Sequence, residues 1–217
     1  MTRAVFLAVT WLLTMTASAQ IPYYANTVGN GKLYGYSSLS VRPGINRQGT
    51  YTTFQYGIGD HLTTGIDLRT IPDCAYWGAL IRYGLPICQW FNLGAAVTPS
   101  FDLNHHFKFS YLISALYLNG AISKNGHLFW CTNTWWTVNK GAAAEYSNYE
   151  YLGYTISMKK HYAITPMIGA THSWKFNQDA TIDTGFYITY KSWNLYLWAD
   201  DILDAHPRYI IGLDFAL

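Results

Sequence analysis

Histidine and serine side chains are the groups in this sequence whose chemistry suits hydrolysis. Asn104-His105-His106 lies in a segment expected to be a loop, and His172-Ser173 lies near the end of an alternating segment. With Ser110 or Ser114, such histidines would form an acyl hydrolase only if a serine lay within hydrogen-bond reach of its base. No GxSxG or HExxH motif supports that arrangement. The catalytic candidates are therefore His105, His172 and Ser173, and a function other than catalysis is favoured.

Metal binding finds little support in the same residues. His105 and His106 are adjacent, so in a strand they would face opposite sides, and only a loop would let both bind one ion. Cys74, Cys88 and Cys131 show no CxxC spacing. We expect unpaired thiols, although one disulfide remains open, and we predict no metal and no cofactor.

Seven charged residues share the strand parity of glycine, serine and threonine, which we expect to face the interior of a barrel. They are Asp67, Arg69, Arg82, Lys108, Asp183, Lys191 and Asp214. Such residues either line a pore and tune its selectivity or form ion pairs that fill a small lumen. Leu112 and Leu116 have the same predicted parity and favour partial filling.

Alternation of apolar and polar residues indicates the elements that must hold these groups. Phe54, Tyr56 and Ile58 alternate with Thr53, Gln55 and Gly57, and similar segments follow along the chain. The longest apolar stripe, predicted to face outward, is Phe107, Phe109, Tyr111, Ile113, Ala115 and Tyr117. The pattern predicts an all-β fold, a closed antiparallel transmembrane barrel of about 12 strands, with ten as the nearest alternative.

Loop lengths support this topology, because long and short connections alternate along the chain. Gly59-Asp60-His61 and Lys124-Asn125-Gly126 are short, whereas 139–148 and 201–207 are longer, as expected when both termini lie in the periplasm. Pro166 falls inside a predicted strand, where it lacks a backbone N–H. We expect a bulge there or a different strand boundary.

A soluble β-protein also alternates, but four further features favour a membrane barrel. The segments reach nine or more residues, and their polar side is rich in Gly, Ser, Thr and Asn. Charged residues are only 12% of the chain and aromatics 18%. Aromatic residues gather near segment ends, as membrane girdles do. Those residues are Tyr51, Tyr56, Trp77, Tyr83, Tyr151, Tyr190 and Trp193.

The N-terminus has the pattern of a secretory signal peptide. Arg3 precedes an apolar run, and Ala17-Ser18-Ala19 fits the small-x-small cleavage rule. We predict cleavage after Ala19, a short periplasmic segment at 20–31 and the barrel at 32–217. The mature chain is then almost uncharged overall, which gives no indication of nucleic-acid binding.

The segment Tyr209–Leu217 alternates to the end of the sequence, with Phe215 two residues before Leu217. It resembles the C-terminal signature of bacterial outer-membrane β-barrels, which usually end in an aromatic residue. The resemblance implies a Gram-negative outer membrane, contact with its lipid, and recognition of Phe215 and Leu217 by the barrel-insertion machinery. It matches no specific family.

Three functions are compatible with such a barrel. The favoured prediction is a small porin-like or transporter-like protein that passes or binds a small solute. The alternatives are a hydrolase acting on lipid or lipopolysaccharide and a structural or adhesin-like surface barrel.

Overall fold

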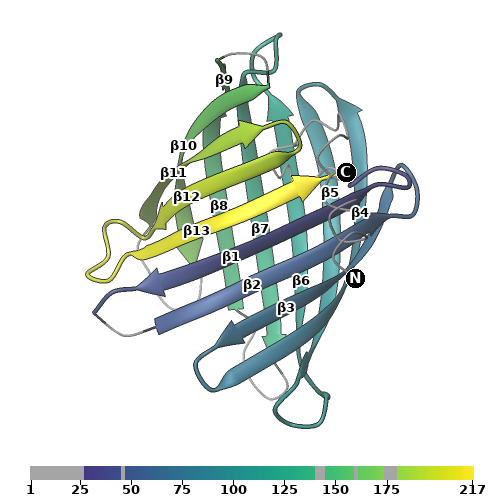
Figure 1. The fold of residues 1–217 in the computed structure, drawn as a ribbon, viewed down its shortest axis with the longest axis vertical. Coiled ribbons are helices and arrows are strands. Elements are labelled where there is room, and N and C mark those ends of the chain that lie inside the picture. Colours follow the sequence, from purple (N-terminus) through teal and green to yellow (C-terminus); the bar gives the residue numbers. More distant parts are fainter. Residues whose placement is uncertain (1–26, 45–46, 140–144, 159–160, 174–179) are drawn as a thin grey trace, which may run out of the picture.

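The computed structural model describes residues 27–44, 47–139, 145–158, 161–173 and 180–217, which form one closed antiparallel β-barrel (Figure 1). Its strands are β1 (Leu33–Arg42), β2 (Arg47–Gly57), β3 (Leu62–Ile71), β4 (Cys74–Cys88), β5 (Phe91–Asp102), β6 (Lys108–Ala121), β7 (Leu128–Asn139), β8 (Glu145–Tyr154), β9 (Ile156–Ser157), β10 (Tyr162–Ser173), β11 (Thr181–Tyr190), β12 (Trp193–Asp200) and β13 (Arg208–Ala216). Because β9 continues the line of β8 along β10, these strands make twelve crossings, and the predicted 12-strand barrel is confirmed.

The predicted signal peptide 1–19 lies outside the described residues, as do residues 20–26 of the predicted periplasmic segment and the predicted turn at 159–160. Within the described ranges, no helix is long and apolar enough to cross a membrane.

The first and last strands close the sheet. β1 and β13 pair from Tyr34↔Ala216 to Val41↔Tyr209. Two backbone hydrogen bonds extend the seam, from Leu33 N to Leu217 O at 3.0 Å and from Leu217 N to Leu33 O at 2.8 Å. We call the end of the barrel that carries Leu33 and Leu217 the terminal end. The opposite end, which carries segments 72–73, 103–107 and 201–207, is the loop end.

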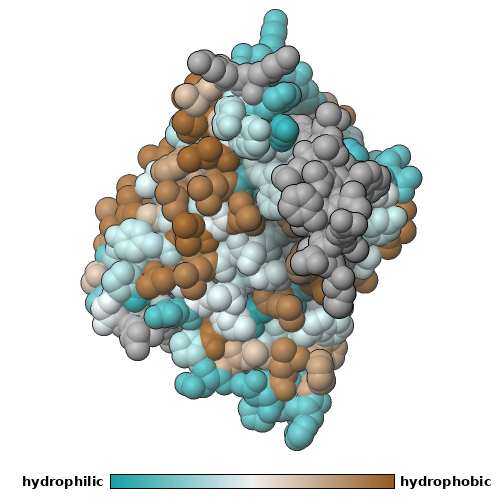
Figure 2. All heavy atoms as spheres, in the orientation of Figure 1, coloured by the Kyte–Doolittle hydropathy of each residue, from teal (hydrophilic) through white to brown (hydrophobic). Residues whose placement is uncertain are grey.

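The outer face of the barrel is mostly apolar. Exposed outward side chains include Phe54, Ile66, Ile81, Val97, Leu152, Ile168, Ile188, Leu195 and Ile211. Their strand neighbours on the inner face are less exposed, and Thr53 and Gln55 on either side of Phe54 are buried. Figure 2 shows hydrophobic residues over the flank formed by β10 to β12 and hydrophilic residues at the lower end. The apolar side chains suit contact with acyl chains. The closed sheet suits the same environment, because it pairs its backbone groups internally.

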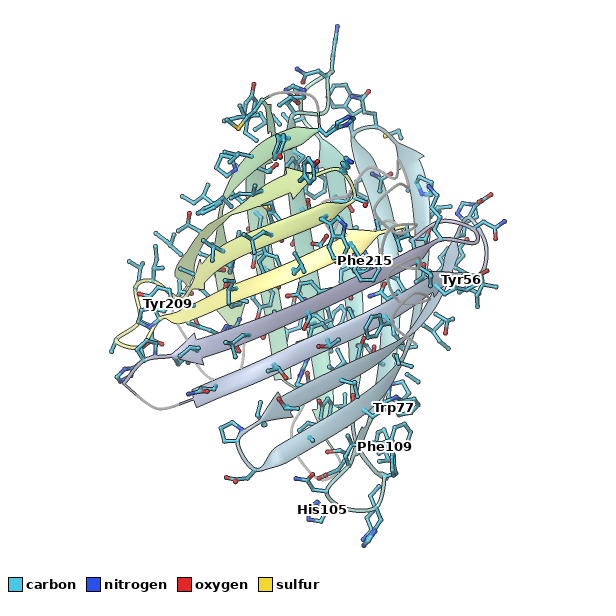
Figure 3. All side chains as sticks on the ribbon, in the orientation of Figure 1. Tyr56, Trp77, His105, Phe109, Tyr209 and Phe215 are labelled. Atoms are coloured by element: carbon cyan, nitrogen blue, oxygen red, sulfur yellow. The ribbon has the colours of Figure 1, made fainter. Side chains whose placement is uncertain are left out.

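Aromatic side chains mark both rims of the apolar face. Trp77, Phe109 and Tyr209 lie towards the loop end, and Tyr56 and Phe215 lie towards the terminal end (Figure 3). Aromatic rings at two levels are typical of the two membrane interfaces.

A β-bulge in β6 overturns the predicted outward stripe. Ser100 pairs with Tyr111, but the next residue, Phe101, pairs with Phe109, so Ser110 is an extra residue. An extra residue reverses the facing of everything beyond it. Phe109 therefore stays outward, whereas four predicted outward residues are buried inside the barrel. They are Tyr111, Ile113, Ala115 and Tyr117.

The same bulge corrects the predicted inward residues of β6. Leu112, Ser114 and Leu116 alternate with the buried Ile113 and Ala115, so they lie on the outward side. Leu112 and Leu116 therefore do not fill the lumen. Buried tyrosines take that place instead.

Pro166 causes no bulge and no change of boundary, contrary to the prediction. β10 passes through it, pairing Pro166 with Phe186 of β11 in unbroken register. On its other side the pairs Ile164↔Ile156 and Met167↔Gly153 also keep one register. The lack of an N–H breaks the ladder locally without shifting the chain, and this break separates β8 from β9.

Candidate solute site in the barrel lumen

Aromatic rings cover one wall of the lumen. Tyr36 of β1 stacks on Tyr196 of β12, with ring centroids 5.4 Å apart and ring planes 5° apart. Tyr187 of β11 lies 5.3 Å from Tyr196. Tyr151 of β8 meets Trp198 edge to face at 5.1 Å and 85°. Both arrangements are favourable for aromatic pairs, so the wall is held by its own contacts.

Four glycines seat these rings against the sheet. In each case the glycine is the direct cross-strand partner of an aromatic residue, as the pairs Phe129↔Gly153, Tyr151↔Gly169, Trp198↔Gly185 and Tyr196↔Gly212 show. A Cβ at any of the four would come within 2.2 Å of the ring. The missing side chain therefore lets each ring lie over the neighbouring strand. The rings therefore lie along the barrel wall and do not project across the lumen.

The opposite wall is more closely filled. Leu80, Ala96, Ala115 and Tyr117 form a buried cluster on β4 to β6, with Trp135 of β7 packed against it. The rings of Tyr117 and Trp135 meet at 5.3 Å. Packing on this side leaves the open space of the lumen next to the tyrosine-rich wall.

A cavity of about 390 Å³ lies between these walls. Its lining combines rings, hydroxyls, an amide and two guanidinium groups. The lining residues are Tyr36, Arg69, Ile113, Phe129, Cys131, Asn133, Trp135, Thr137, Ser147, Tyr149, Tyr151, Met167, Tyr187, Tyr196, Trp198, Asp200, Arg208 and Ile210. Mostly apolar and aromatic pockets of roughly 300–1,000 Å³ with a few placed polar groups are typical of small-molecule sites.

The charges in the cavity are largely balanced. Asp200 is buried and accepts a hydrogen bond from Arg208 Nε at 2.7 Å, and it also pairs with Arg208 Nη2. Trp198 Nε1 donates to the other oxygen of Asp200. The Arg69 guanidinium lies 5.7 Å from the centroid of the Tyr51 ring. The cavity thus presents aromatic faces and hydroxyls with one ion pair and one further cation.

A second polar network lies towards the loop end. Arg42 pairs with Asp201 and donates to His206 O at 2.9 Å. The backbone N–H of Asp201 donates to Asp183 Oδ1 at 2.9 Å. The network joins the loop between β12 and β13 to β1 and β11, so it fixes the position of that loop at the loop end of the lumen.

The predicted inward charges occupy different places in the structure. Asp67 and Arg82 lie on the inner face, where Arg82 donates to Gln55 Oε1. Asp183 and Asp214 are fully buried, and Asn194 Nδ2 donates to Asp214 Oδ1 at 2.8 Å. Arg69 reaches the cavity.

Two of the seven lie at the ends of the barrel. Lys108 is the first residue of β6, opposite Asp102, and is exposed. Lys191 is exposed in the turn between β11 and β12, with its ammonium 5.4 Å from the centroid of the Tyr190 ring. A role for any of the seven in solute passage remains a prediction.

The catalytic candidates lie apart from the cavity. His105 is in the loop after β5, beyond Phe109 (Figure 3), and its Nδ1 lies 2.8 Å from Asp102 Oδ2. This interaction lowers the pKa of the Asp102 carboxyl at the loop end of the barrel. Within the described part of the chain, no hydroxyl is recorded in hydrogen bond with His105.

His172 and Ser173 end β10. His172 pairs in register with Asn148 and shares the outward parity of Ile168. The Ser173 side chain lies outside the described residues. Cys74, Cys88 and Cys131 are free thiols. Among the side chains that the structure describes, no three His, Cys, Asp or Glu residues gather as metal ligands.

Several lumen aromatics escaped prediction. Tyr51 and Tyr151 were expected in the outer girdles, but both lie on the inner face. Tyr51 shares the parity of the buried Thr53, opposite to that of the exposed Phe54. Tyr151 lines the cavity. The small or polar residues two positions further along, Thr53 and Gly153, indicated that Tyr51 and Tyr151 face inward. For Tyr36, Tyr196 and Trp198, the sequence does not indicate the facing unless the strand register is known.

Comparison with known proteins rests on structure alone, because no protein-family model and no curated protein sequence matches the chain. A KdgM porin structure aligns with a TM-score of 0.59 at 10% identity, covering 84% of this chain and 98% of the porin. A KdgM porin in complex with disordered oligogalacturonate gives the same values. A NanC porin structure aligns at 0.58 and 10% identity over 83% and 98%.

This chain has a porin fold. The porins are covered almost entirely, so the likeness includes the whole barrel and the predicted porin-like barrel is confirmed. At this level of identity the comparison shows the fold and leaves the solute to be argued from the lumen itself.

Proposed function

We propose that this chain is an outer-membrane porin-like protein that binds a small solute in the aromatic cavity and passes it through the barrel. The observation that carries the proposal is the cavity of about 390 Å³, lined by rings and hydroxyls, inside a barrel whose outer face is apolar. A structural barrel needs no such space, because buried interiors otherwise pack with few voids larger than a water molecule.

The lining indicates a ring-shaped polar solute such as a small saccharide. Flat rings offer faces to the apolar side of a sugar, and phenol and amide groups offer hydrogen bonds to its hydroxyls. One solved neighbour is a KdgM porin in complex with oligogalacturonate, an acidic saccharide. In this chain Asp200 neutralises Arg208, so we expect uncharged sugars to bind and any preference for acidic sugars to rest on Arg69 alone.

Location in the outer membrane forms part of the proposal. We propose export with cleavage after Ala19 and recognition of Phe215 and Leu217 by the insertion machinery. The mostly apolar outer face and its two aromatic rims support a membrane-spanning state. Unboiled protein from the membrane fraction is expected to migrate differently on a gel from boiled protein, and identical migration would contradict the barrel in the membrane.

Planar-bilayer recording of the purified mature chain tests solute passage. We expect discrete conductance steps that small uncharged saccharides reduce in a concentration-dependent way. Absence of conductance at every voltage would overturn passage. Conductance that no saccharide alters, in a series that includes oligogalacturonate, would overturn saccharide binding while leaving passage in place.

A further inference from the structure

The outer face of β7 and β8 carries a hydrogen-bonded group of polar side chains that includes a carboxylate. We define the β7–β8 polar cluster as Thr132, Thr134, Asn148 and Glu150, with His172 of β10 beside it. Thr132 and Thr134 donate to Asn148 Oδ1 at 3.2 and 2.8 Å. Asn148 Nδ2 donates to Glu150 Oε1 at 3.0 Å. β7 and β8 lie side by side at the back of the barrel in Figure 1.

The cluster lies at the depth of the acyl chains. On β7, Trp130 and Trp136 flank the two threonines on the outward side, and on β8 the outward residues Tyr154 and Tyr146 lie on either side of Asn148 and Glu150. Rings at both ends of a strand mark the two membrane interfaces. Polar groups between them face hydrocarbon, where lipids offer neither donors nor water.

Glu150 is the unusual member of the cluster. Among the described strand side chains, it is the one Asp, Glu, Lys or Arg that alternates in phase with the outward apolar residues. It is exposed, and within the described chain it accepts one hydrogen bond, from Asn148. Outward hydroxyls elsewhere pair with one another, as Ser37 and Thr52 do at 2.9 Å. A lipid-facing carboxylate is costly unless a donor reaches it.

We infer that the β7–β8 polar cluster is a self-association surface, and that its occupant is a second copy of this chain. Two copies in one membrane relate by a two-fold axis along the membrane normal, which keeps every residue at its own depth. Thr132 is the Cα partner of Glu150, and Thr134 is the partner of Asn148. The hydroxyls of both threonines are used on Asn148 Oδ1, whereas the Asn148 amide has a second N–H besides the one donated to Glu150. Across a two-fold axis, each copy presents this second N–H to the Glu150 carboxylate of the other.

This pairing requires no component beyond the chain itself. The cluster holds both an acceptor, the Glu150 carboxylate, and a donor, the second amide hydrogen of Asn148 Nδ2, so two copies of the surface are complementary. Hydrogen bonds across a membrane interface replace unsatisfied polar groups in hydrocarbon. The inference needs a membrane-spanning barrel but does not depend on solute passage.

Energy transfer between donor-labelled and acceptor-labelled copies in phosphatidylcholine vesicles tests the inference. We expect wild-type transfer to persist when the protein is diluted with lipid. Glu150→Leu should weaken association about tenfold or more, the loss expected for a hydrogen bond to a charged group. The double variant Thr132→Val/Thr134→Val should weaken it as well, because the two hydroxyls orient the Asn148 amide. Thr52→Val, which removes an outward hydroxyl on the other side of the barrel, is the matched control and should leave transfer unchanged.

Heat-modifiable gel migration verifies that each variant is folded before transfer is measured. A wild-type protein that is monomeric at every protein-to-lipid ratio overturns the inference, as does undiminished transfer in folded Glu150→Leu. Cross-linking in native membranes that captures a different protein on β8, and no second copy, also overturns it. Conductance recorded from the dissociated Glu150→Leu variant keeps this test separate from that of the proposed channel.

Discussion

Tyr36 and Tyr196 stack face to face although β13 separates their strands. The contact is possible because Tyr196 lies over Gly212, its direct partner on β13, and reaches the far neighbour β1. The missing side chain at Gly212 therefore lets one pair of rings span three strands. The width of the cavity beside β13 depends on this arrangement.

Replacing Tyr196 with alanine should enlarge the lumen. The ring is buried and contacts both Tyr36 and Tyr187, so its removal opens the cavity at its wall. We expect a higher single-channel conductance in planar bilayers and weaker block by saccharides. Tyr190→Ala, which removes an exposed ring in the outer girdle, is the matched control and should conduct like wild type. An unchanged conductance in Tyr196→Ala would show that this ring does not limit the path.

Adding a methyl group at Gly212 should displace the Tyr196 ring. The new Cβ would lie 2.1 Å from the ring, and we expect a loss of about 1 kcal/mol in the free energy of unfolding, the scale of an aromatic pair. Urea titration in lipid vesicles measures this. Gly59→Ala, with no heavy atom near its Cβ, should change stability by less than about 0.5 kcal/mol.

The double variant Gly212→Ala/Tyr196→Ala makes the cause explicit. Once the ring is absent, the methyl group at position 212 has room, so its cost should disappear. Additive losses in this cycle would mean that the methyl group acts through something other than Tyr196.

Neutralising Asp200 should shift ion selectivity towards anions. Asp200→Asn removes the carboxylate that balances Arg208 in the cavity. The reversal potential in a gradient of dilute KCl reports the shift, since low salt limits screening. Asp204→Asn is the control, because Asp204 is half exposed in a loop and lies 4.0 Å from Arg42. Equal shifts in both variants would contradict a selective role for the Arg208–Asp200 pair.

The facing of β6 can be read directly with lipid quenchers. In a background where Cys74, Cys88 and Cys131 are replaced by serine, a fluorophore on Leu116→Cys should be quenched by brominated acyl chains. The same fluorophore on Ile113→Cys should be protected, because Ile113 faces the lumen. The reverse result would mean that Ser110 does not form a bulge and that the strand keeps uninterrupted alternation.

Strands and their number were predictable because alternation records which side of each strand is apolar. The apolar residues of β2, β3 and the first part of β5 face outward, as predicted. The number of alternating segments predicted the twelve crossings. Pro166 also shows that one missing N–H is tolerated where its two neighbours hold the register.

The lumen was less predictable, for two physical reasons. The bulge at Ser110 exchanges inside and outside in β6, and nothing in a run of Phe, Tyr and Leu marks where an extra residue lies. Tyrosine also suits either side of a barrel, since its ring is apolar and its hydroxyl polar. Tyr196 became recognisable as a lumen residue only through Gly212, the glycine that pairs with it.

The seating of rings on glycines has a consequence for how such a channel is remodelled. If the ring and the glycine of one facing pair trade strands, the same atoms fill the wall about 4.8 Å further round the circumference, with the backbone unaltered. Bore and shape thus become adjustable by compensated exchanges, Tyr196 for Gly212 being one, whereas a lone substitution at either position leaves a hole or a collision.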